Sequence, residues 1–159
     1  MLLAKKIDEG LFSWDTSAQV LYHEFTTLDK ERGKVITVED LVGNGSGYTQ
    51  RFIATLLTSD KKPAEKLFNA VSNTEAKYKK EDKHYAYNND FFAAAGFIAT
   101  QNDGKPSYNK YARALKEELF KPLEMESTTA YIPEAWLSPN FAIGHRAVNK
   151  SWTDKKKKL

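Results

Sequence analysis

The chain has 159 residues, of which 41% are hydrophobic and 28% are charged, and it contains no cysteine. This length and hydrophobic content suit one ordinary globular core and exclude a disordered composition. The absence of cysteine excludes disulfides and thiol catalysis, and a net charge of +3 is too small to indicate a nucleic-acid-binding protein.

The first predicted helix looks like the end of an amphipathic segment. Leu2, Leu3 and Ile7 have helical spacing, and Gly10 tolerates the left-handed conformation that closes many helices. No capping residue precedes Leu2, so we expect this helix to have lost its N-terminal part. A loop and then an irregular stretch are expected up to Gly33.

Most of the remaining chain is predicted to be helical. Thr37 can cap a short helix that ends at Gly43, and the Asn44–Gly47 segment accepts positive φ, which predicts a sharp turn. Helices are then expected over residues 50–57, 64–72 and 89–100 and from a Ser107 cap to Pro122, with irregular pieces over 123–132 and 139–148. The 89–100 segment is the most apolar, so it should be the buried core helix.

A Tyr-x-Asn pattern at the start of the core helix is the sharpest chemical feature. Tyr87 and Asn89 lie two residues apart at a loop-to-helix junction, so both side chains can point into one cleft. A structural interpretation stays open, in which the tyrosine is buried with a satisfied hydroxyl and the asparagine caps the helix. A short pattern of common residue types does not decide between the two.

The segments around this pattern resemble those of one enzyme family. In order, they are Ile36-Thr37-Val38-Glu39-Asp40-Leu41-Val42, Ser46-Gly47, Tyr85-Ala86-Tyr87-Asn88-Asn89, Phe97-Ile98, Tyr111, and Leu119-Phe120-Lys121-Pro122-Leu123-Glu124-Met125 followed by Ser127-Thr128. They resemble the serine β-lactamases and penicillin-binding-protein-like hydrolases, in particular the class C and esterase-like branch. The resemblance implies a mainly α chain, namely the helical lobe of a β-lactamase/transpeptidase-like α/β fold with most of the α/β lobe missing. It implies a partial domain over residues 1–148. The lysines at positions 155–158 separately predict a basic tail over 149–159.

The resemblance also implies roles for individual residues. The family uses a Ser-x-x-Lys element as nucleophile and base, a Tyr-x-Asn element across the cleft, and a Lys-Thr-Gly or His-x-Gly element on a strand. Tyr87 and Asn89 match the second element and are the candidate catalytic residues. Tyr87 would take and return the serine proton, and Asn89 would orient a small acyl substrate. One departure is Asn44-Gly45, which stands where the family has a His-Thr pair.

The first and third elements are expected to be absent. Two formal Ser-x-x-Lys matches occur, at Ser59 to Lys62 and at Ser107 to Lys110. The first is followed at once by a proline, so its lysine prefers an extended backbone. The second lies downstream of Tyr87, whereas the family's nucleophile precedes the Tyr-x-Asn element and would fall just before Met1. No Lys-Thr-Gly or His-x-Gly follows Arg146.

We therefore expect a fragment of a serine hydrolase that is inactive as written, or alternatively a non-catalytic helical domain that binds a peptide or protein. No cofactor or metal site is predicted, because the three histidines are far apart and cysteine is absent. Nucleic acid and membranes are not expected partners, whereas apolar surface exposed by a missing lobe would favour self-association. With no signal peptide and no cysteine, the cytoplasm is the default location.

Overall fold

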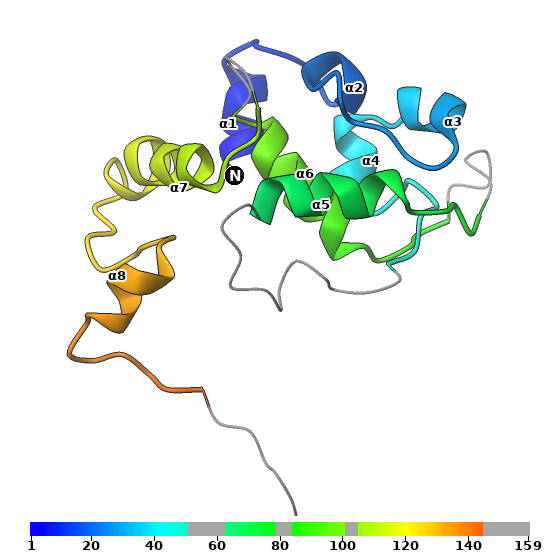
Figure 1. Ribbon diagram of the computed structural model, residues 1–159. Coiled ribbons are helices and arrows are strands. Elements are labelled where there is room, and N and C mark those ends of the chain that lie inside the picture. Colours follow the sequence, from blue (N-terminus) through cyan, green and yellow to red (C-terminus); the bar gives the residue numbers. More distant parts are fainter. Residues whose placement is uncertain (51–62, 79–83, 101–104, 145–159) are drawn as a thin grey trace, which may run out of the picture. The chain divides into compact units, whose positions relative to one another are not determined.

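The structure is a computed structural model that describes residues 1–50, 63–78, 84–100 and 105–144 (Figure 1). The chain divides into two compact units between Thr128 and Thr129, and each is described by itself. All the candidate site residues described below belong to the first unit. Residues 51–57 of the expected helix 50–57, the Ser59 to Lys62 match and the basic tail 149–159 lie outside the described residues.

Helices make up nearly all the regular structure that is described in the first unit. They are α1 (Leu2–Asp8), α2 (Ala18–Leu21), α3 (Lys30–Lys34), α4 (Val38–Gly43), α5 (Pro63–Ser72), α6 (Asn89–Ile98) and α7 (Tyr108–Leu115), which runs on into a π-helical segment, η3 (Lys116–Phe120). Within the described ranges, β pairing is limited to isolated antiparallel bridges from Ser17 to Thr37 and from Tyr48 to Ala76. The predicted mainly α architecture is confirmed. None of the described helices is long and apolar enough to cross a bilayer.

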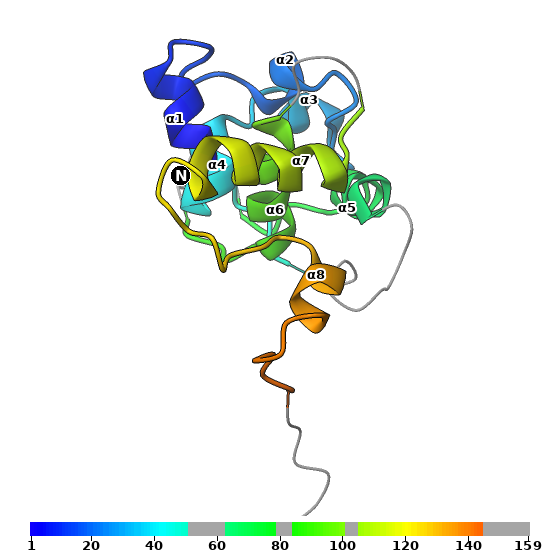
Figure 2. The same cartoon turned by 90° about the vertical axis from the view of Figure 1, so that its left-hand side faces the viewer.

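Helix α6 is the central element of the first unit. It is contacted by α1, α2, α4, α5 and α7 (Figures 1 and 2). Its inward side chains include Phe91, Ala94, Ala95, Phe97 and Ile98, all of which are buried. The small residues allow close packing, because a Cβ added at Gly96 would lie 3.1 Å from the Tyr111 ring on α7. The expected core helix is confirmed, although it ends at Ile98.

The turn after α4 has the geometry that the sequence predicts. Thr37 and Asp40 form a capping box, since each side chain accepts a hydrogen bond from the other residue's backbone N–H. After α4 ends at Gly43, Asn44 and Gly47 have φ values of 56° and 76°. These left-handed residues reverse the chain and bring the segment that follows alongside the start of α6.

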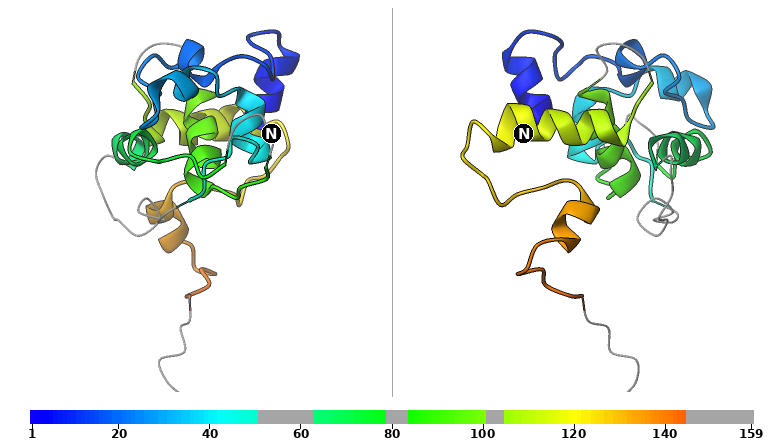
Figure 3. Two further views of the ribbon diagram at one scale, coloured as in Figure 1. Left: turned by 90° about the vertical axis from the view of Figure 1, so that its right-hand side faces the viewer. Right: turned by 60° about the vertical axis from the view of Figure 1, so that its left-hand side comes forward.

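The expectation of an irregular stretch up to Gly33 is wrong. Helices α2 and α3 lie there, and their N-caps are Ser17 and Asp29, whose side chains accept hydrogen bonds from Gln19 N and Arg32 N. Each helix is little more than one turn, which is too short to show an apolar periodicity in the sequence. The N-caps supply the local stabilisation. Helix α8 (Ile132–Trp136), in the second unit (Figure 3), is equally short and was not predicted.

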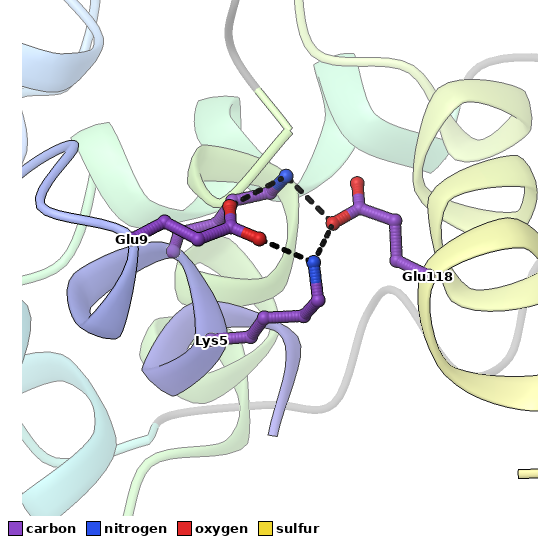
Figure 4. Close-up of polar contacts among 4 residues, drawn as sticks. Lys5, Glu9 and Glu118 are labelled. Carbon is purple, nitrogen blue, oxygen red and sulfur yellow. Dashed lines mark hydrogen bonds and ion pairs between the residues drawn. The ribbon is translucent and has the colours of Figure 1, made fainter. Parts of the chain in front are cut away.

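An ion cluster joins α1 to η3. Lys6 Nζ lies 2.6 Å from Glu118 Oε2 and 3.6 Å from Glu9 Oε2. Lys5 also pairs with both carboxylates (Figure 4). The hydrogen bond from Lys5 lowers the pKa of Glu9. Because Lys6 is only 8% exposed, its ammonium needs these partners, and the cluster fixes the N-terminal helix against the end of the α7–η3 segment.

Candidate functional site

Tyr87 and Asn89 lie at the N-terminal end of α6 and contact each other. The Tyr87 hydroxyl donates a hydrogen bond of 2.9 Å to Asn89 Oδ1. Asn89 is the first residue of α6 and is partly buried, whereas Tyr87 is 60% exposed. The structural interpretation of a buried tyrosine is therefore wrong. An exposed phenol beside an ordered carboxamide is able to contact a ligand.

The residue between them, Asn88, is the one that caps α6. Its Oδ1 accepts a hydrogen bond of 3.0 Å from Phe91 N, and its Nδ2 donates one of 3.1 Å to the carbonyl oxygen of Tyr48. Asn88 is 1% exposed. Since Asn88 does the capping, the side chain of Asn89 is released for other contacts. The alternative interpretation, in which Asn89 caps the helix, is therefore wrong.

Asn44 fixes the backbone on both sides of Tyr87. Its carbonyl oxygen accepts a hydrogen bond of 2.9 Å from Ala86 N, and its Oδ1 accepts one of 2.9 Å from Asn88 N. Ala86 and Asn88 are buried while Tyr87 points outward between them. The tyrosine is thus an exposed side chain on an anchored backbone, which is the arrangement that a preorganised site needs.

Gln50 holds Asn89 from the other side. Its Oε1 accepts hydrogen bonds from Asn89 N, at 3.2 Å, and from Asn89 Nδ2, at 3.0 Å. A carboxamide has two N–H donors and two acceptor lone pairs, and the bonds to Gln50 and Tyr87 use one donor and one lone pair of Asn89. The other described residues thus leave one donor and one lone pair of Asn89 unused. No signal in the sequence pointed to Gln50.

The segment around Tyr48, whose carbonyl oxygen binds Asn88, is anchored by buried contacts. The Tyr48 hydroxyl lies 2.8 Å from Thr27 Oγ1, and the Arg32 guanidinium lies 5.1 Å from the centroid of the Tyr48 ring. Arg32 Nη2 also donates a hydrogen bond of 2.9 Å to Ser46 O. Burial raises the pKa of Tyr48, so this phenol stays neutral. These contacts fix the carbonyl oxygen that Asn88 binds.

The two ends of the described Ser-x-x-Lys match, Ser107 and Lys110, line different cavities. Ser107 has an extended backbone at the N-cap of α7, as expected for its position, but its hydroxyl makes no capping hydrogen bond. It lines a cavity of about 240 Å³, whereas Lys110 lines a different cavity of about 420 Å³. Neither cavity is lined by Tyr87 or Asn89. Within the described part of the chain, no three His, Asp or Glu side chains gather to hold a metal ion.

Comparison with known families identifies one family for the chain. The family model described as Beta-lactamase matches residues 1–156. No curated protein matches the chain. The matched range contains the 44–50 turn and the 86–89 segment, that is, every residue of the candidate site. The resemblance predicted from the sequence is confirmed at the level of the family.

Proposed function

The chain belongs to the β-lactamase family, and we propose that Tyr87 and Asn89 form the Tyr-x-Asn side of a serine acyl-hydrolase site. Its described structure is the mainly α part of that fold. Enzymes of this type open an amide, ester or β-lactam bond through a serine acyl-enzyme. In such a site, Asn89 orients the acyl group of the substrate and Tyr87 handles the serine proton.

One observation carries this proposal, namely the hydrogen bond from the Tyr87 hydroxyl to Asn89 on a backbone that Asn44 anchors. Two side chains that are only two residues apart gain little stability from an exposed contact of this kind. Buried Asn88 already caps the helix and satisfies the backbone. The exposed pair is therefore better explained by contact with a ligand than by folding.

We also propose that these 159 residues do not catalyse acyl transfer by themselves. The covalent pathway needs a serine whose proton a neighbouring base can take. Ser107 and Lys110 face different cavities, and neither of these cavities includes Tyr87. Without the nucleophile, the pair can bind and polarise an acyl group but cannot form an acyl-enzyme.

Binding of a β-lactam tests the role of Asn89. We expect benzylpenicillin to shift the backbone NMR signals of residues 85–92 in a saturable way. Asn89→Ala should weaken this binding about fivefold, because one hydrogen bond contributes about 1 kcal/mol. Asn73→Ala, at an exposed asparagine after α5, should leave the affinity unchanged. Binding that Asn89→Ala does not weaken would contradict the proposed role.

A non-catalytic binding domain for a peptide or protein is the second candidate. Its support is the exposure of Tyr85 and Phe92, which are 69% and 58% exposed next to Tyr87. Aromatic side chains are enriched at protein interfaces. This candidate predicts that benzylpenicillin does not bind at all, so the same titration separates the two. Turnover of an ester or β-lactam that Tyr87→Phe abolishes would exclude it.

A further inference from the structure

The hydrogen bonds between Gln50, Asn89 and Tyr87 have a fixed direction. A backbone N–H can only donate, so the Gln50 atom that faces Asn89 N must be the oxygen. The same oxygen faces the side chain of Asn89, which must therefore present its NH₂ group to Gln50. This leaves Asn89 Oδ1 facing Tyr87, so the Tyr87 hydroxyl must be the donor.

Gln50 keeps this orientation although no described residue accepts a hydrogen bond from its own NH₂ group. Gln50 Nε2 is buried and has no hydrogen-bond partner among the described residues. Turning the Gln50 carboxamide would place that donor against two other donors and lose both hydrogen bonds to Asn89. The backbone N–H of Asn89 therefore sets the polarity of the whole chain of side chains.

The opposite orientation of Asn89 is disfavoured by the same contacts. If its carboxamide turned over, Oδ1 would face Gln50 Oε1 across the 3.0 Å now bridged by a hydrogen bond. Two acceptor oxygens at that distance repel each other. Asn89 can turn only if the Gln50 carboxamide turns with it, which costs the hydrogen bond from Asn89 N, or if Gln50 moves away or is replaced.

We propose that Gln50 is a positioning residue that locks the carboxamide of Asn89 and so directs the proton of Tyr87 toward Asn89. The relevance of this positioning to catalysis rests on the proposed function of Tyr87 and Asn89. In this state Tyr87 offers only lone pairs to a ligand, and the proton that it holds points away from the ligand. If Tyr87 gave up this proton to solvent water and acted as a base, its phenolate would face the acceptor oxygen of Asn89. A base role therefore favours a turned Asn89 carboxamide, whose NH₂ group faces the phenolate and whose bond to Gln50 is broken.

The side-chain amide signals of Asn89 in the ¹⁵N-labelled full chain test this inference. They are assigned by their disappearance in Asn89→Asp. In the unchanged protein we expect one of the two amide protons to lie downfield with a small temperature dependence, because it is bonded to Gln50. Gln50→Leu should remove that downfield signal, and Gln50→Glu, which keeps an acceptor, should retain it and move it further downfield.

Tyr87→Phe is the matched control, because it removes the bond at the other side of Asn89 and should leave the downfield proton in place. Asn89 signals that Gln50→Leu does not change would overturn the inference. If Gln50→Leu does not fold, an unchanged downfield shift in Gln50→Glu would overturn it equally. The NMR experiment contains no substrate, so its result does not depend on β-lactam binding. A failure of β-lactam binding would remove the proposed role of the pair in catalysis but not the hydrogen bond between Gln50 and Asn89.

Discussion

Asn88→Ala is expected to lower the free energy of unfolding by about 2–4 kcal/mol. The substitution removes the N-cap of α6, since Phe91 N loses its acceptor. It also leaves the buried carbonyl oxygen of Tyr48 without the donor that now lies 3.1 Å away. Because α6 is the central helix, the loss should appear as a lower midpoint in urea denaturation.

Asp29→Ala separates these two contributions. Asp29 caps α3 from an exposed position, so its loss costs only the cap, about 1 kcal/mol. Asn88→Asp is a second control, because it keeps the acceptor for Phe91 N but places a carboxylate against the Tyr48 carbonyl oxygen. We expect Asn88→Asp to destabilise more than Asp29→Ala. Equal effects of Asn88→Ala and Asp29→Ala would contradict the anchoring role of Asn88.

Gly47→Ala is expected to destabilise the protein by about 2–5 kcal/mol. Gly47 has a φ of 76°, and a Cβ there would lie 2.5 Å from Arg32 Nη2 and 2.8 Å from the carbonyl oxygen of Tyr78. Arg32 can move only by giving up its hydrogen bond to Ser46, and the Tyr78 contact is with backbone. The turn that carries Asn44 and leads to Gln50 should therefore shift, and thermal unfolding should occur at a lower temperature.

Gly10→Ala is a closely matched control for this substitution. Gly10 has the same φ of 76°, but a Cβ there would meet no atom within 4 Å. Only the left-handed strain remains, which costs about 1–2 kcal/mol. The difference between the two variants measures the close contacts of Gly47, about 1–3 kcal/mol. If the two variants lost the same stability, the packing described around Gly47 would be wrong.

The features that the sequence predicted correctly depend on local rules. The Thr37 cap, the left-handed turn at Asn44 and the central position of the apolar 89–98 segment follow from neighbouring residue types. The short motifs, taken in order, identified the family. Each of these predictions needed information from only a few neighbouring positions at a time.

The contacts that hold the site could not be predicted from one sequence. Asn44 and Asn88 are 44 positions apart, and Gln50 and Asn89 are 39 apart, so nothing local indicates that they meet. Two adjacent asparagines at a helix start also leave open which of them is the cap. The departure at Asn44, where the family has histidine, now has a physical role, because its side chain binds Asn88 N.

The direction of the hydrogen bonds from Tyr87 through Asn89 to Gln50 bears on the proposed role of Tyr87 as a base. A base role for Tyr87 was inferred from the family, whereas the hydrogen bonds direct its proton to Asn89. The two agree if the carboxamide of Asn89 turns during the reaction. In the proposed site, Tyr87 as it stands presents lone pairs to a donor group, whereas the second N–H of Asn89 suits an acyl oxygen, and proton transfer needs a rearrangement that Gln50 opposes.

Intact-mass spectrometry after incubation with benzylpenicillin, with nitrocefin turnover recorded in parallel, tests the central claim most directly. The claim is that the chain carries the Tyr-x-Asn side of a serine hydrolase site but no nucleophile placed to use it. The unmodified mass and no turnover above buffer are therefore expected, for this chain and for Tyr87→Phe alike. A benzylpenicilloyl adduct on Ser59 or Ser107, formed by the unchanged chain and lost in Tyr87→Phe, would contradict the claim.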